Sequence, residues 1–130
     1  MAFEAGQGHY PYQAGIDAYG DGGFRFAGMS HRGSLLCLPT GMYAWDVQAA
    51  NEITRDSLSR VFESAGEIDV LLIGTGGDIA GIAPDIRAAL REKGVIVEAI
   101  ATGGAVRTYN VLLSEDRAVA AALISVEKAR

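Results

Sequence analysis

The stretch Ile68-Asp69-Val70-Leu71-Leu72-Ile73, followed by Gly74-Thr75-Gly76-Gly77, decides the fold of this chain. Its first part is a nearly continuous aliphatic run, which is typical of a β-strand that is covered on both faces. The glycines after it provide the main-chain freedom that a tight turn needs at the end of a buried strand. We therefore expect a β-sheet with other elements packed against both of its faces.

Helices and strands alternate around this strand in the second half of the chain. Apolar spacing, capping residues and glycine stops predict helices over Thr54–Gly66, Pro84–Lys93 and Thr102–Glu115, and further strands at Val95–Ile100 and Val119–Ile124. Strands that alternate with helices of about ten residues pair in parallel through right-handed crossovers. The second half is therefore predicted to be a parallel βαβαβ unit.

The first half instead carries short alternating segments and glycine turns. Strands are predicted at Ile16–Tyr19, Phe24–Phe26, Ser34–Leu38 and Tyr43–Trp45, with turns at Gly20–Gly23 and Met29–Gly33. This pattern favours an antiparallel meander. The predicted fold class is α/β, a single three-layer domain over residues 14–130 in which one mixed sheet contains the meander and the parallel half. Residues 1–13, rich in glycine and aromatic side chains, are predicted to form a partly ordered N-terminal arm.

Composition narrows the classes of partner and the location. Apolar residues make up 49% of the 130 residues and charged residues 21%, the balance of an ordinary folded domain. The formal charge is −5, and no cluster of lysine or arginine is present, which argues against nucleic acid or an anionic membrane surface as the partner. The longest apolar run is too short to span a bilayer. Met1–Gly8 lacks the features of a secretory signal, so a cytoplasmic location is predicted.

Two glycine loops form the first candidate site. Gly74–Asp78 follows a predicted strand at its carboxyl end, where open α/β sheets usually bind ligands, and Ala101–Gly104 follows the next strand. Together they could form a concavity of main-chain N–H groups that holds an anion. The loop lacks both common phosphate motifs, because Ile79 replaces the last glycine of G-x-G-x-x-G and no G-K-[ST] is present. The structural alternatives, a tight exit from the strand and a helix cap at Thr102, are favoured.

The predicted third helix contains Thr108, Tyr109 and Asn110, none of which is a strong helix former. Another force is therefore expected to hold them there. Tyr109 lies on the apolar face, so we expect it to be buried with its hydroxyl group hydrogen-bonded. The alternative is that Thr108 and Asn110 point toward the crevice at the strand ends, where they would help the glycine loops to bind a ligand. That binding hypothesis fails if the two loops do not converge on one crevice or if Tyr109 is wholly buried. The candidate crevice then comprises Gly74, Thr75, Gly76, Gly77, Thr102, Thr108, Tyr109, Asn110 and Arg117.

The sequence offers no set of catalytic or metal-binding residues. His9 and His31 are far apart, and neither has a second ligand at the spacing of a zinc site. Cys37 lies in an apolar strand, which indicates an inert core thiol. No nucleophile, base and orienting group can be assembled. We therefore expect no metal and no cofactor, and a non-enzymatic role is favoured.

Several spaced motifs resemble one family. They are Ile16–Tyr19, Leu38-Pro39, Leu72–Gly76, Gly94–Glu98, Thr108-Tyr109-Asn110 and Arg117 with Ala121–Ile124. The chain is similar over Gly15–Val126 to a family of small α/β domains that includes the mitochondrial respiratory complex I assembly factor 3 and the adipogenesis-associated domain protein.

The resemblance implies a single three-layer α/β domain and no established reaction, cofactor or catalytic residue. The family's recurrent polar positions correspond to Gly74, Thr75, Gly76, Thr108, Tyr109, Asn110 and Arg117. Gly77-Asp78 departs from the family pattern. The leading hypothesis is an accessory protein that binds a protein partner, an assembly intermediate or another assembly factor, in the cytoplasm and peripheral to the inner membrane through that partner. The alternatives are a small-molecule or anion-binding protein, with or without enzymatic activity, and a structural homo-oligomer.

Overall fold

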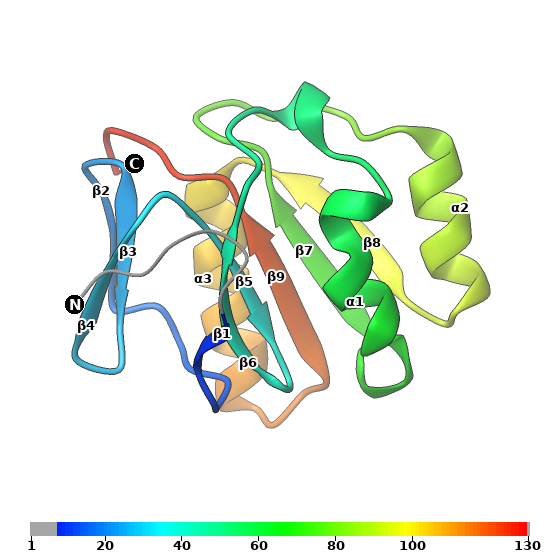
Figure 1. Cartoon of the computed structure of the whole chain (residues 1–130), viewed down its shortest axis with the longest axis horizontal. Coiled ribbons are helices and arrows are strands. Elements are labelled where there is room, and N and C mark those ends of the chain that lie inside the picture. Colours follow the sequence, from blue (N-terminus) through cyan, green and yellow to red (C-terminus); the bar gives the residue numbers. More distant parts are fainter. Residues whose placement is uncertain (1–7, 130) are drawn as a thin grey trace.

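A six-stranded mixed sheet forms the centre of the molecule in the computed structural model, which describes residues 8–129 (Figure 1). Its strand order is β1-β6-β5-β9-β7-β8. Pairing is antiparallel from β1 to β9 and parallel among β9, β7 and β8. The strands are β1 (Gly8–Tyr10), β5 (Ser34–Leu38), β6 (Gly41–Trp45), β7 (Val70–Gly74), β8 (Ile96–Ile100) and β9 (Val119–Leu123). The predicted parallel βαβαβ half is confirmed.

Three further strands form a second, smaller antiparallel sheet in the order β2-β3-β4, with β2 at Ala18–Gly20, β3 at Gly23–Phe26 and β4 at Met29–Arg32. The predicted meander is divided between the two sheets: its segments Ile16–Tyr19 and Phe24–Phe26 overlap β2 and β3, whereas Ser34–Leu38 is β5 of the central sheet. The predicted turn at Met29–Gly33 is wrong, because the chain already reverses at Ala27-Gly28. Both of these residues have positive φ, 52° and 75°, and Phe26 pairs with Met29 across a two-residue hairpin turn.

The helices are α1 (Ser59–Glu63), α2 (Pro84–Glu92) and α3 (Thr102–Ser114), with short 3-10 turns η1 (Ala50–Glu52), η2 (Asp56–Leu58) and η3 (Ala65–Glu67). The predicted helix at Thr54–Gly66 is therefore broken into η2, α1 and η3. Arg55, and not Thr54, occupies the cap position of η2, but the Thr54 hydroxyl accepts the N–H of Ser57 at 3.0 Å. No helix within residues 8–129 combines the length and the apolar character that crossing a membrane requires.

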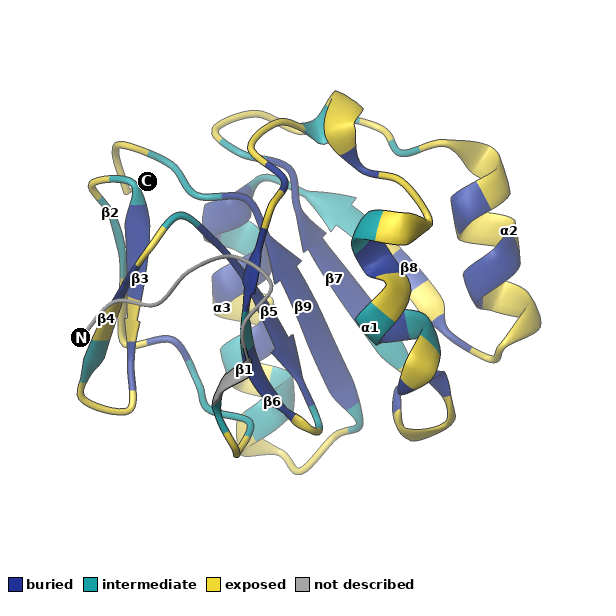
Figure 2. Cartoon of the chain, in the orientation of Figure 1, coloured by how far each residue is buried: buried dark blue, intermediate teal, exposed yellow. Residues whose placement is uncertain are grey.

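The central sheet lies between two layers, so the three-layer prediction is confirmed. Leu71 and Ile73 of β7 pack with α1 and α2, whereas Leu72 packs with α3 and the small sheet. Figure 2 shows β5, β9 and β7, in the middle of the sheet, almost entirely buried, as expected of strands that are covered on both faces. Strand β1 belongs to the predicted N-terminal arm, and residues 1–7 of that arm lie outside the described residues.

Candidate functional site

The two glycine loops lie side by side at the carboxyl ends of β7 and β8. The N–H of Thr75 donates to the carbonyl of Ile100 at 2.8 Å, and the N–H of Thr102 donates to the carbonyl of Gly76 at 2.9 Å. The end of β9 joins them, because the N–H of Ile124 donates to the carbonyl of Gly74 at 2.9 Å. Main-chain hydrogen bonds therefore tie three segments together at this edge of the sheet.

Thr102 is the centre of this junction and is fully buried. Its hydroxyl donates to the carbonyl of Ile124 at 2.7 Å and accepts the N–H of Gly76 at 3.0 Å. Its predicted role as a helix cap is wrong: Thr102 is already the first residue of α3, and Ala101 occupies the cap position without a side-chain bond. The hydroxyl instead pins the glycine loop to the end of β9.

Thr75 shapes the loop that follows β7. Its hydroxyl lies 2.7 Å from the carbonyl oxygen of Asp78 and 3.1 Å from that of Ile100, and it accepts the N–H of Ala80 at 3.1 Å. Gly76, with φ of 99°, adopts a conformation that a residue with a side chain rarely reaches. The polar atoms of this threonine are therefore engaged within the loop itself.

Tyr109 and Asn110 face the N-terminal segment. Tyr109 is fully buried, and its hydroxyl donates to the carbonyl of Ala14 at 2.7 Å, which confirms the predicted burial with a hydrogen bond. Burial, and secondarily the nearby Cys37, raises the pKa of Tyr109 far above its ordinary value. Asn110 binds both main-chain polar groups of Ile16 at 2.8 Å. These are structural bonds between α3 and the start of the domain.

The structure brings together only part of the predicted set. Gly74, Thr75, Gly76, Gly77 and Thr102 meet at the loop junction, whereas Arg117 precedes β9 and therefore lies at the opposite end of the parallel strands. Thr108 is exposed on α3. Because Thr102 and Tyr109 are buried, their side chains are inaccessible to a ligand. The burial of Tyr109 counts against a crevice that includes it, since the hypothesis required this side chain to be accessible. Ligand binding by the accessible loop residues stays a prediction.

Open space near the junction lies on the outer side of the glycine loop. A groove of about 580 Å³ is bounded by the 75–80 loop, the segment 48–50 and the segment 124–128. A smaller recess of about 70 Å³ at the start of α3 is lined by Gly76, Gly77 and Arg107, among others. Arg107 and the segments 48–50 and 124–128 were not predicted to lie near the glycine loop. They are distant from it along the chain, and no local pattern indicates that they are close to it in space.

Two kinds of reactive group would indicate chemistry in the described residues: metal-binding clusters and an accessible thiol. Within residues 8–129, no group of three histidine, cysteine, aspartate or glutamate side chains is placed to hold a metal ion. Cys37 is fully buried, and burial raises the pKa of its thiol far above the ordinary value, so it remains protonated and inert. This agrees with the inert core thiol indicated by the sequence.

The family is decided by comparison with known sequences. A family described as "Protein of unknown function (DUF498/DUF598)" matches residues 16–124. The chain belongs to this family. A relative from Rhodobacter capsulatus, described as an uncharacterized protein, is 42% identical over 109 residues, which cover 84% of this chain and 82% of the relative.

Relatives with a named role are NADH dehydrogenase [ubiquinone] 1 alpha subcomplex assembly factor 3 of mouse and human. They are 32% and 33% identical to this chain, over 91% and 93% of its length. The matched region spans 64% of the mouse protein and 63% of the human protein. The resemblance seen in the spaced sequence motifs is thereby confirmed.

Solved structures confirm the fold. A crystal structure described as an outer membrane protein from Bartonella henselae is 52% identical, with a TM-score of 0.88 over 92% of this chain and 100% of that chain. A Mth938-like domain from Bordetella pertussis is 26% identical, with a TM-score of 0.76 over 98% of this chain and 94% of that chain. The DUF498/DUF598 domain described here is thus a Mth938-like α/β fold.

Proposed function

We propose that this chain is an accessory factor in the assembly of an NADH dehydrogenase complex and that it acts by binding a protein partner, without catalysing a reaction. The observation that carries the proposal is the 32% identity to the mouse assembly factor over 91% of the chain. We place the protein in the cytoplasm, held at the membrane that carries the complex through its partner.

The geometry of the family's polar positions supports a binding role. Thr75, Tyr109 and Asn110 direct polar atoms to main-chain groups of the same chain, so a role in the fold accounts for these side chains. A domain of this kind acts most simply through its surface.

The proposal is tested in the cells from which the chain comes. The protein is tagged at its chromosomal locus, cross-linked at native expression and purified, and the expected result is enrichment of NADH dehydrogenase subunits or their assembly factors. Deletion of the gene should reduce the assembled complex on native gels, and the wild-type gene should restore it. Normal assembly in the deletion strain, with no such protein enriched, would contradict the proposal.

A further inference from the structure

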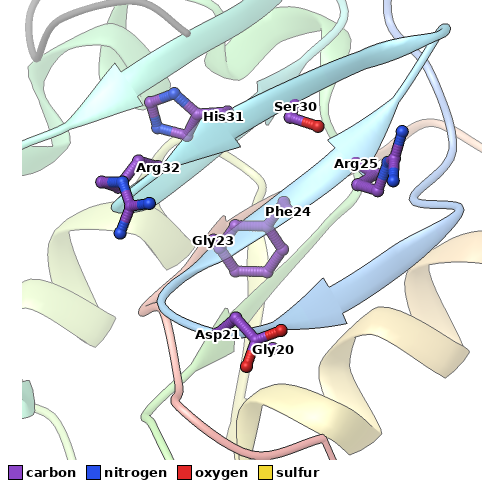
Figure 3. A pocket seen from close by; sticks show the side chains of 8 residues that line it. All are labelled: Gly20, Asp21, Gly23, Phe24, Arg25, Ser30, His31 and Arg32. Atoms are coloured by element: carbon purple, nitrogen blue, oxygen red, sulfur yellow. The ribbon is translucent and has the colours of Figure 1, made fainter.

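The outer face of the small sheet carries a pocket that the proposed function leaves unexplained. The pocket has a volume of about 290 Å³ and is lined by residues of β2, β3, β4 and the β2–β3 turn: Gly20, Asp21, Gly23, Phe24, Arg25, Ser30, His31 and Arg32. Figure 3 shows Arg25 and Arg32 on opposite sides of it, with Gly23 and Phe24 between them. It is therefore an open recess flanked by two guanidinium groups.

Strand register places both arginines on the same face. Phe24 pairs with His31, and both are buried, so their neighbours Arg25 and Arg32 point to the outside. Arg25 pairs with Ser30, and Arg32 pairs with Gly23. The two arginines are thus diagonal neighbours, whose Cα atoms lie roughly 7–8 Å apart in an antiparallel pair.

Two small residues, Gly23 and Ser30, line the recess together with the arginines. Gly23 is buried in a place where a side chain does not fit, because an added Cβ would collide with the main-chain oxygen of His31. Ser30, the cross-strand partner of Arg25, lies on β4, which is an edge strand of the small sheet within residues 8–129. The recess therefore gives access to both guanidinium groups from the side of the edge strand β4.

The charge of this face is opposite to that of the molecule. The chain carries a formal charge of −5, whereas the pocket contains two exposed arginines and one carboxylate, Asp21. A guanidinium group binds a carboxylate through two parallel hydrogen bonds. A local positive surface on an acidic protein attracts anionic groups to that surface. The ligand chemistry indicated is an anionic group with two acceptor oxygens, such as a carboxylate or a phosphate.

The spacing favours an extended protein segment over a small anion. Alternate residues of an extended strand project to one face about 6.7 Å apart. The cross-strand pair that contains Arg25 and the pair that contains Arg32 are also two residues apart along the strands, so their separation is the same. Edge strands such as β4 are sites at which extended segments add to a sheet. Resting on the proposed function, we infer that the partner docks an acidic extended segment along β4, with carboxylates at alternate positions bound by Arg25 and Arg32.

A peptide-binding experiment tests this site without reference to the partner. The probe is a short fluorescein-labelled peptide in which glutamate alternates with threonine, titrated with the full chain and followed by fluorescence anisotropy at low salt. Saturable binding is expected, and Arg25→Glu with Arg32→Glu should weaken it by about tenfold or more. The control, Arg91→Glu with Lys93→Glu, changes the charge equally on exposed residues at the end of α2 and should leave binding within about twofold.

Three results would overturn the inference: equal binding by the two double variants, equal binding of a glutamine version of the peptide, or tighter saturable binding of inorganic phosphate than of the peptide. If the double glutamate variant does not fold, as judged by circular dichroism, the single variants Arg25→Gln and Arg32→Gln replace it. Each should then weaken binding by a measurable part of the same loss.

A second arm separates this inference from the proposed function. The Arg25→Glu, Arg32→Glu chain is tagged and purified from native cells beside the wild type. Loss of the NADH dehydrogenase proteins from the variant alone supports the docking site. Their equal recovery by both chains overturns the site but leaves the assembly role intact. Their absence from the wild-type sample counts against the assembly role, and the peptide measurement then decides the site.

Discussion

The side-chain amide of Asn110 forms two hydrogen bonds with the main chain of Ile16: its Oδ1 accepts the N–H and its Nδ2 donates to the carbonyl, both at 2.8 Å. The asparagine thus satisfies the main-chain N–H and carbonyl groups of Ile16, as the main chain of a neighbouring strand would. Because Ile16 is buried, water cannot easily replace these bonds. The pair joins α3 to the segment that leads into the small sheet.

Replacing Asn110 with alanine should therefore lower the free energy of unfolding by about 2–3 kcal/mol, since two buried main-chain groups lose their partner. Urea denaturation followed by circular dichroism measures the loss. Thr108→Ala is the control, because Thr108 is exposed on the same helix and should change stability by less than about 0.5 kcal/mol. Equal effects of the two substitutions would show that the two hydrogen bonds of the Asn110 amide do not contribute measurably to the free energy of unfolding.

Thr102→Val tests the junction of the glycine loop with β9. Valine keeps the shape of the side chain but removes the hydroxyl that bridges Gly76 and Ile124, so a loss of about 2–3 kcal/mol is expected. Thr102→Ser retains the hydroxyl and loses only a methyl group, at a cost of about 1 kcal/mol. Chemical denaturation of both variants gives the comparison, and a serine variant as unstable as the valine variant would refute the role of the hydroxyl.

Much of the fold was predictable because its signals are local. The aliphatic run at Ile68–Ile73 overlaps β7, and Pro84 and Gly94 mark the two ends of α2. The sequence also indicated that Asn110 has a partner outside its helix. Because asparagine is a poor helix former, a tertiary interaction was expected to hold it there, and the hydrogen bonds to Ile16 are that interaction.

Long-range partners explain what the sequence did not reveal. A threonine at a helix start looks like a cap, and nothing local to Thr102 indicates that its hydroxyl partner is Ile124. The division of the predicted meander between two sheets depends on how distant segments pack, and periodicity does not encode this. The placement of Arg25 and Arg32 on one face likewise required the observed turn at Ala27-Gly28, which sets the register of β4.

Gly74 should not tolerate even the smallest side chain. A Cβ built at this residue would lie 2.9 Å from both the Cα and the Oγ1 of Thr102, and 3.1 Å from Leu123 Cδ2. Gly74→Ala is therefore expected to destabilise the protein by about 1–3 kcal/mol through overpacking. Gly77→Ala, where an added Cβ meets nothing within 4 Å, is the matched control in thermal and urea unfolding. A neutral Gly74→Ala would mean that β7, α3 and β9 can move apart at little cost.

Cys37 should make the protein less stable in alkaline solution. Burial raises the pKa of its thiol far above the ordinary value in the folded state. In the unfolded chain the same thiol has the ordinary pKa of about 8.5. Above that pH the unfolded state binds fewer protons than the folded state, so the free energy of unfolding falls as pH rises. Below it both states are protonated, and the thiol contributes no pH dependence.

The expected contribution of this thiol approaches about 1.4 kcal/mol per pH unit above pH 9 or so. Cys37→Ala should remove it, so unfolding curves measured from pH 7 to pH 10 should show a shallower decline than the wild type, whatever the variant's stability at neutral pH. An independent check is reaction with a thiol reagent, which should be slow in the folded protein and fast in denaturant. Rapid modification of the folded chain, with identical slopes for the two proteins, would contradict a protonated, buried Cys37.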